Sequence, residues 1–131
     1  MCWVEVQARA IGDVENWSAY DDMLKFSNCW NVNVNNCVVV GGREDCIDMC
    51  RGGDYRIQNS SLIIMGKNGI TCKCGVEGLR VEGVEFDGYG MFSEIEIGMF
   101  SKYDKFPFKN KVQDVIISDV KRKDGKKSCV S

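Results

Sequence analysis

The pattern of apolar and polar residues repeats along this chain at a nearly fixed interval. A run that starts at Tyr55 alternates apolar and polar positions, and a matching run starts at Leu79, about 24 residues later. Related runs start at Val32 and Val115. Strict alternation predicts strands with one buried face. A unit of strand, turn and strand repeated at this length is typical of a solenoid, in which successive turns stack on one another.

The fifth position of each run holds a residue type that tolerates the left-handed backbone region. These residues are Asn36, Asn59, Gly83 and Asp119. We therefore predict a sharp corner at this position in every turn of the chain. The inward stack before the corner is expected to contain Val34, Ile57, Val81 and Ile117. The last position of the run holds Leu62 in one copy and Phe86 in the next, but Arg122 in the last copy. The apolar core is therefore predicted to end at Arg122.

A second strand recurs elsewhere in each turn as a triplet of apolar, polar and apolar residues. The triplets start at Leu24, Ile47, Ile70 and Ile95, again about 24 residues apart. Alternation places the first and third residues of each triplet in the core and directs the middle residue outward. The predicted outward row consists of Lys25, Asp48, Thr71 and Glu96.

The chain of 131 residues is predicted to form one domain with four segments. Residues 1–27 are expected to be an N-terminal cap or first coil, and residues 28–98 the regular coils. Residues 99–111 contain the only proline and four aromatic residues, which predicts an inserted surface loop. Residues 112–131 are expected to form the last coil and a basic tail.

The unit of strand, Asn-type corner, strand and Gly-rich turn, repeated at about 24 residues, resembles the single-stranded right-handed parallel β-helix of the pectin-lyase-like superfamily. The resemblance covers about Leu24 to Val120 and implies an all-β solenoid of about five coils. Small hypothetical β-helix proteins of phages and bacteria are similar in segments 42–49 and 94–98. Large superfamily members that act on pectate use carboxylates that hold calcium and a basic residue as base, and that set cannot be placed here residue by residue.

The composition is that of an ordinary globular protein, with 44% hydrophobic residues, 27% charged residues and a formal charge of −2. This balance gives no reason to expect a nucleic acid partner. No apolar stretch approaches the roughly 20 residues of a membrane span, and the N-terminus lacks the pattern of a secretory leader. We therefore expect a cytoplasmic protein without a membrane partner.

The chain contains no histidine, which removes the usual general base and the imidazole ligands of metal sites. Its eight cysteines include Cys46, Cys50, Cys72 and Cys74, which suggest a zinc site at first sight. Their spacing differs from the two-residue knuckles that zinc sites usually use, and Cys50 is expected to point outward. We therefore predict that Cys37 and Cys72 are small buried hydrophobic side chains, with zinc as the alternative. No metal and no cofactor are expected.

Carboxylates gather on and beside the outward row, at Glu44, Asp45, Asp48, Glu94 and Glu96. The sequence favours a solvated sheet face whose alternating charges keep the protein soluble. A calcium or glycan site and catalysis are the alternatives. For catalysis, Asp48 and Glu96 lie two turns apart, so their backbones are expected to be roughly 10 Å from each other. That separation would suit a water molecule between the two carboxylates of an inverting glycosidase.

Six aromatic residues could form a binding platform, either for a sugar or for a partner protein. They are Tyr89, Phe92, Phe100, Tyr103, Phe106 and Phe108. Some of them could instead hold the inserted loop against the solenoid. Interleaved lysines are a weak indication of single-stranded nucleic acid on a chain of net negative charge.

The sequence favours a non-catalytic protein-interaction module of a phage or another mobile element, which binds a partner through its outer face and the loop of residues 99–111. A protein that binds or cleaves a polysaccharide, with Asp48 and Glu96 as its catalytic pair, is the alternative. Uncapped solenoid ends also make self-association an expectation.

Overall fold

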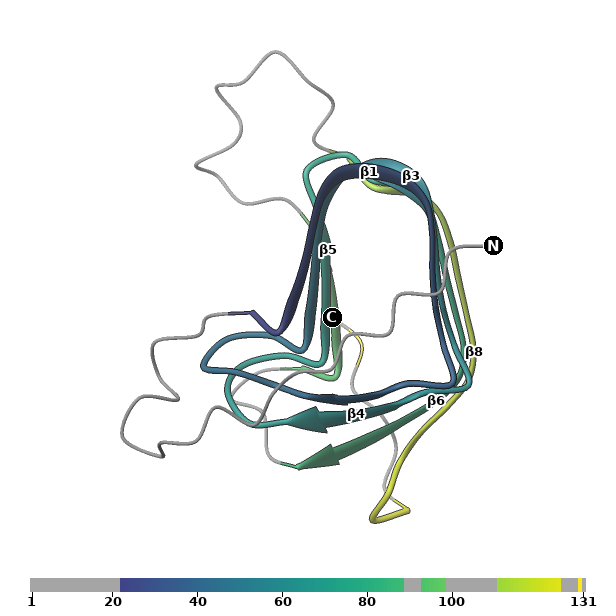
Figure 1. The fold of residues 1–131 in the computed structure, drawn as a ribbon. Helices are drawn as coiled ribbons and strands as arrows, with labels where there is room; N and C mark the ends of the chain where they lie inside the picture. Colours follow the sequence, from purple (N-terminus) through teal and green to yellow (C-terminus); the bar gives the residue numbers. More distant parts are fainter. Residues whose placement is uncertain (1–21, 89–92, 99–110, 126–129, 131) are drawn as a thin grey trace.

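Every regular element in the described part of the chain is a β-strand. The computed structural model describes residues 22–88, 93–98, 111–125 and 130, and none of these is helical. The strands are β1 (Leu24–Asn35), β2 (Val38–Val40), β3 (Ile47–Gln58), β4 (Ser61–Ile64), β5 (Ile70–Lys73), β6 (Glu77–Gly88), β7 (Ile95–Gly98) and β8 (Gln113–Arg122) (Figure 1). The prediction of an all-β protein is therefore confirmed. Among the described residues, no helix has the length and apolar character needed to cross a membrane.

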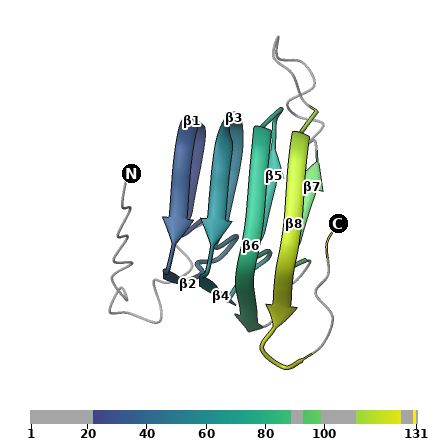
Figure 2. The ribbon, with the colours of Figure 1, turned by 90° about the vertical axis from the view of Figure 1, so that its right-hand side faces the viewer.

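All the strands belong to one open sheet, and all their pairings are parallel. The order is β2-β4-β6-β3-β5-β7, with β1 beside β3 and β8 beside β6 (Figure 2). In one row, Leu24 pairs with Ile47, Ile47 with Ile70 and Ile70 with Ile95. These are the triplet positions that the sequence predicts to lie side by side.

The register of the other predicted row is also confirmed. Val34 pairs with Ile57, Ile57 with Val81 and Val81 with Ile117. The sequence interval between Val81 and Ile117 is longer than the other intervals because residues 99–112 separate β7 from β8. Residues 1–21 and 99–110 lie outside the described part, so the predicted cap and inserted loop, with the division into four segments, stay predictions.

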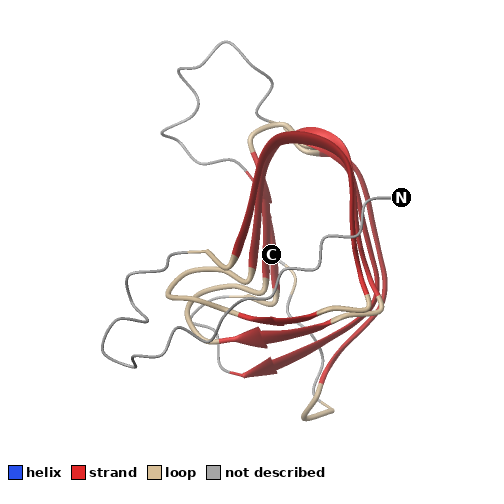
Figure 3. Ribbon diagram, in the orientation of Figure 1, coloured by secondary structure: helices blue, strands red, loops and turns tan. Residues whose placement is uncertain are grey.

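The sheet bends into three walls (Figures 1 and 3). We call the wall made by β5, β7 and the first residues of β1 and β3 the first wall. The second wall consists of the later residues of β1 and β3 with the first parts of β6 and β8. The third wall consists of β2, β4 and the last residues of β6 and β8. Long strands continue from one wall to the next through the bends.

Residues with positive φ mark the bends. The predicted corner between the second and third walls has φ values of 55° at Asn36, 50° at Asn59, 64° at Gly83 and 50° at Asp119, which confirms the corner prediction. Two further rows with positive φ lie between the first and second walls, and the sequence analysis missed them. They consist of Asn28, Arg51 and Cys74, and of Asn31, Asp54, Gly78 and Asp114.

The hydrophobic core lies between the three walls and receives side chains from each of them. Ile47 comes from the first wall, Ile57 from the second and Leu62 from the third, and each is at most 1% exposed. Complete burial of such a side chain contributes about 1.5–3 kcal/mol. In the third wall Arg122 pairs with Phe86, and its Nε lies 3.4 Å from Oε1 of Glu94. The apolar row therefore ends where the sequence predicts.

Candidate functional site

The predicted aromatic platform cannot be placed. Tyr89 and Phe92 belong to segment 89–92, and Phe100, Tyr103, Phe106 and Phe108 belong to segment 99–110. Both segments lie outside the described residues. The binding role of these six residues stays a prediction.

The predicted outward row forms, but two of its members are not solvated. Asp48 is 1% exposed and Thr71 is 2% exposed. The Nζ atom of Lys25 on β1 lies 2.9 Å from Oδ2 of Asp48, and the Nζ atom of Lys73 on β5 lies 3.2 Å from the same oxygen. The hydrogen bond to Asp48 raises the pKa of Lys25. A solvated face is therefore the wrong description of Asp48 and Thr71, because alternation fixes only a side chain's direction and says nothing of what covers it.

A second polar row lies two residues before the triplets and was missed by the sequence analysis. Each side chain accepts a hydrogen bond from the backbone N–H of the next member: Oδ1 of Asp22 from Asp45 at 3.1 Å, Oδ1 of Asp45 from Asn68 at 3.2 Å, and Oδ1 of Asn68 from Ser93 at 2.9 Å. The members are separated by 23, 23 and 25 residues. The same spacing that revealed the triplets could have revealed this row.

Two other predicted carboxylates also have partners in this network. Nδ2 of Asn68 donates to Oε2 of Glu96 at 2.8 Å and to Oγ1 of Thr71 at 3.2 Å. Glu94 is buried and forms the ion pair with Arg122 described above. Thr71 stands between Asp48 and Glu96 in the register. These contacts support a structural role for the predicted catalytic pair, and its role in binding or catalysis stays a prediction.

Three carboxylates of the first wall approach one another closely. One oxygen each of Asp22, Asp45 and Asp48 lies within 4.8 Å of the others. Burial, and after it the charge of Asp48, raises the pKa of Asp22 to about 6, and burial raises the pKa of Asp45. Because Lys25 and Lys73 already supply two positive charges beside Asp48, the cluster is poorly suited to an additional cation.

The raised pKa of Asp22 predicts a pH-dependent stability. Its folded pKa of about 6 exceeds the ordinary value of 3.8, so folding favours the protonated form. The contribution is fully present below pH 3.8 and is lost as the pH rises through about 6. Between pH 5 and pH 7.5 the loss of this contribution should lower the free energy of unfolding by about 1 kcal/mol. Urea denaturation at both pH values measures it.

The control for this prediction is Asp22→Asn, which keeps the oxygen that accepts the N–H of Asp45 but cannot ionise. We expect the variant to lose less stability than the wild type between the two pH values. The same loss in both proteins would show that Asp22 does not titrate in this range.

The buried cysteines are poorly suited to zinc. Burial raises the pKa of Cys46 and of Cys72 to about 12, as it does for Cys74, where a hydrogen bond with Cys50 adds to the effect. Among the described residues, three or more side chains of the metal-ligating types bring their ligand atoms within 4.8 Å of one another only at Asp22, Asp45 and Asp48, so the cysteines form no such cluster. In register, Cys72 pairs with Met49 and Ile97, as predicted for an inward position.

We therefore expect purified protein to contain no stoichiometric zinc, because a thiolate site would require several buried thiols to ionise. Elemental analysis by mass spectrometry measures the metal content. A variant with Cys46, Cys50, Cys72 and Cys74 replaced by alanine is the comparison. One zinc ion per wild-type chain, absent from the variant, would contradict the prediction.

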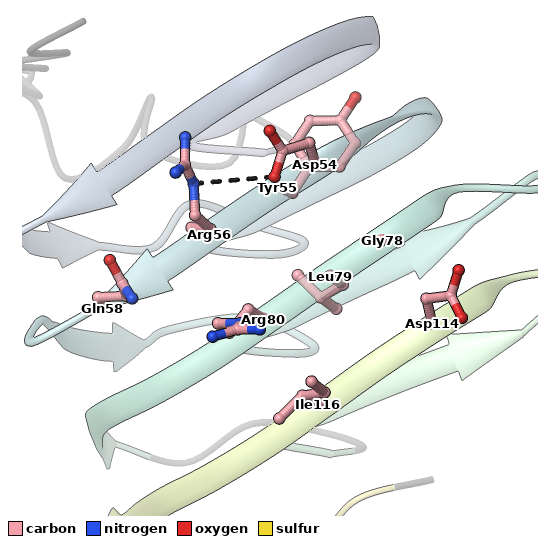
Figure 4. Close-up of a pocket in the computed structure, with 9 residues that line it drawn as sticks. All are labelled: Asp54, Tyr55, Arg56, Gln58, Gly78, Leu79, Arg80, Asp114 and Ile116. Atoms are coloured by element: carbon pink, nitrogen blue, oxygen red, sulfur yellow. Dashed lines mark ion pairs between the residues drawn. The ribbon is translucent and has the colours of Figure 1, made fainter. Parts of the chain in front are cut away.

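The second wall carries a hollow on its outer side that the sequence analysis did not anticipate. Its volume is about 500 Å³ (Figure 4). It is lined by Asp54, Tyr55, Arg56, Gln58, Gly78, Leu79, Arg80, Asp114 and Ile116. These residues come from three neighbouring strands, β3, β6 and β8. We call this hollow the β6 groove, because β6 forms its floor.

Two rows of residues build the β6 groove. The register places Asp54, Gly78 and Asp114 side by side, since the residues on either side of them in sequence pair directly. Gly78 has a φ of 99° and no side chain, which keeps the floor low between the two carboxylates. The next outward row consists of Arg56, Arg80 and Ile116.

Arg56 in the β6 groove donates a hydrogen bond from Nη2 to Oδ1 of Asn31, whereas the ion pairs of the groove are long. Nε of Arg56 lies 4.0 Å from Oδ1 of Asp54, and Nη1 of Arg80 lies 3.5 Å from Oε1 of Glu82. Asp114 has no ion-pair partner among the described residues, and Ile116 is 49% exposed. The groove therefore offers both charge signs and an apolar rim to a ligand.

An exposed tryptophan stands near the β6 groove. Trp30 on β1 is 58% exposed and pairs with Gly53 on β3. A Cβ atom at Gly53 would lie 2.6 Å from Cζ3 of Trp30, so the indole ring packs closely over this glycine. Gly53 directly precedes Asp54, which places the ring beside the acidic row.

No protein family, no curated protein and no solved structure matches this chain. The resemblance to the pectin-lyase-like superfamily therefore stays a prediction. Function has to be argued from the geometry of the sites, because a fold alone does not determine it.

Proposed function

We propose that this chain is a non-catalytic recognition module that binds a partner protein through the outer face of its second wall. The observation that carries the proposal is the β6 groove, in which the charged residues Asp54, Arg56, Arg80 and Asp114 surround a glycine floor. The one hydroxyl of its lining, on Tyr55, is buried and donates to the carbonyl oxygen of Arg51 at 2.7 Å. The groove thus resembles a binding surface more than a site for turnover.

The fold we propose for the module is a short right-handed parallel β-helix of about five coils. Parallel pairing at a nearly constant offset along the chain, and a row of positive-φ residues at each bend, support it. Connections between parallel strands of one sheet are almost always right-handed, which supports the handedness. The loop of residues 99–111 is proposed as a further contact with the partner. The module itself is proposed to be encoded by a phage or another mobile element.

The second candidate function is the binding of an oligosaccharide. Trp30 favours it, because an exposed indole ring beside carboxylate and guanidinium groups offers a stacking surface with polar partners. This candidate uses the same side of the sheet but a different anchor, so the two candidates can be separated by substitution.

The test begins with capture of a partner from lysate and continues with the partner in pure form. We expect direct binding in calorimetry, weakened by Arg80→Glu and unaffected by Trp30→Ala. A glycan array with the wild type and Trp30→Ala runs in parallel. Glycan retention that disappears in Trp30→Ala, without direct binding of any protein, would contradict the proposal and favour the oligosaccharide. Cleavage of a polysaccharide would contradict it as well.

A further inference from the structure

We infer that the β6 groove binds an extended polypeptide segment in which a basic residue, Lys or Arg, and an acidic residue, Asp or Glu, lie two positions apart. This inference rests on the proposed function, since it names the chemistry of the protein segment that the module recognises. It follows from the arrangement of charges in the groove, which has an acidic end and a basic end.

One end of the groove is acidic. Asp54 and Asp114 lie on the two strands that flank β6, so their backbones are about 10 Å apart. Gly78 between them leaves the intervening space without a side chain (Figure 4). Asp114 has no ion-pair partner among the described residues, and the contact of Asp54 with Arg56 at 4.0 Å is longer than a hydrogen bond. A cationic side chain above Gly78 would be within reach of both carboxylates.

The other end of the groove is basic and lies two residues further along the same strands. Arg56 donates from Nη2 to Oδ1 of Asn31, and its Nε is buried without a hydrogen-bond partner among the described residues. Arg56 therefore acts on a ligand through its positive charge, which adds to that of Arg80 beside it in the register. Arg80 is exposed, and its surface ion pair with Glu82 is weak enough to exchange for a ligand carboxylate. Ile116 beside Arg80 can contact the apolar part of the ligand.

The two rows of the groove match the spacing of alternate side chains in an extended chain. Residues two positions apart in a strand lie about 6.6 Å apart on the same side. The acidic and basic rows of the groove are likewise two residues apart on β3 and β6. An extended segment above β6, in either direction, can therefore place its cation over Gly78 and its anion near Arg80. A purely anionic or purely cationic ligand would meet repulsion at one end.

The experiment uses the whole protein and three labelled peptides of equal length. They contain Lys-x-Glu, Lys-x-Lys or Glu-x-Glu at the centre. We expect the first to bind about tenfold more tightly than the other two in fluorescence anisotropy, since each of these replaces a charge-assisted contact by repulsion at one end. In NMR spectra of the ¹⁵N-labelled protein, the first peptide should shift the amide signal of Gly78. Absence of binding at millimolar peptide, or equal affinity for the three peptides, would overturn the inference.

Two pairs of variants locate the binding. Asp114→Asn should weaken the Lys-x-Glu peptide about fivefold, whereas Asp119→Asn should have no effect. Both are exposed aspartates on β8 with positive φ, and only Asp114 lines the groove. Arg80→Glu should shift the preference toward a Lys-x-Lys peptide, and Lys121→Gln is its control outside the groove. Equal losses in Asp114→Asn and Asp119→Asn would overturn the inference.

The failures of the inference and of the proposed function can be told apart. If a purified partner protein binds wild type, Asp114→Asn and Arg80→Glu alike, recognition of a protein stands, but the groove is not the site and this inference fails. If no protein binds directly and a glycan is retained through Trp30, the proposed function fails together with this inference.

Discussion

The substitution Gly52→Ala is expected to lower the free energy of unfolding by about 3 kcal/mol or more, because it combines two costs. Gly52 has a φ of 83°, which disfavours any residue with a side chain. A Cβ atom here would also lie 2.0 Å from the carbonyl oxygen of Cys29 and 2.7 Å from its backbone nitrogen. These atoms belong to the neighbouring strand β1, so they can move only if the strand pairing changes.

Gly125→Ala is the matched control for this prediction. Gly125 has a similar φ of 77°, but no described atom lies within 4 Å of a Cβ placed there. The control should therefore lose only about 1 kcal/mol, the cost of the left-handed backbone. Urea denaturation followed by circular dichroism measures both values. Similar losses in the two variants would mean that β1 and β3 do not approach each other as closely as the structure places them.

The second large effect is expected for Asp48→Ala, at about 3 kcal/mol of lost stability. The substitution removes the carboxylate that Lys25 and Lys73 share, and Lys73 is itself buried. Desolvated charges depend on such a partner, whereas exposed pairs contribute little. Glu85→Ala is the control, because the pair between Glu85 and Lys121 is exposed at 3.8 Å. It should cost less than about 1 kcal/mol.

A double variant tests whether charge is the cause. If the loss in Asp48→Ala comes from the ammonium group of Lys73, then Asp48→Ala combined with Lys73→Met should regain part of the stability. Thermal and urea denaturation of the two single variants and the double variant give the coupling energy. Additive losses would indicate that the carboxylate stabilises the first wall in another way.

Local residue chemistry was sufficient to predict the strands and their register. Period-two alternation identified the strands, and the types of residue at Asn36, Asn59, Gly83 and Asp119 identified one corner. Because both signals recur at the same interval, they also predicted which strands lie side by side. The corners at Arg51 and Cys74 were missed, since neither residue type indicates positive φ. The row of Asn31, Asp54, Gly78 and Asp114 was missed as well, although its residue types do indicate it.

The candidate site depended on contacts that no local pattern records. The β6 groove exists because Gly78 lies between Asp54 and Asp114, and Asp114 reaches that place only through the long step from β6 to β8. Alternation predicted that Asp48 points outward, but its two ion-pair partners come from the neighbouring strands β1 and β5, which no local pattern records.

The sequence by itself determined the all-β composition, the parallel stacking of repeats and the position at which the apolar core ends at Arg122. These properties follow from residue type and spacing, which are one-dimensional quantities. Only the tertiary structure decided which outward side chains are solvated, which are locked in ion pairs and where the second wall is hollow. Those properties depend on the atoms that surround a side chain, and these atoms come from strands that are one or more turns away along the chain.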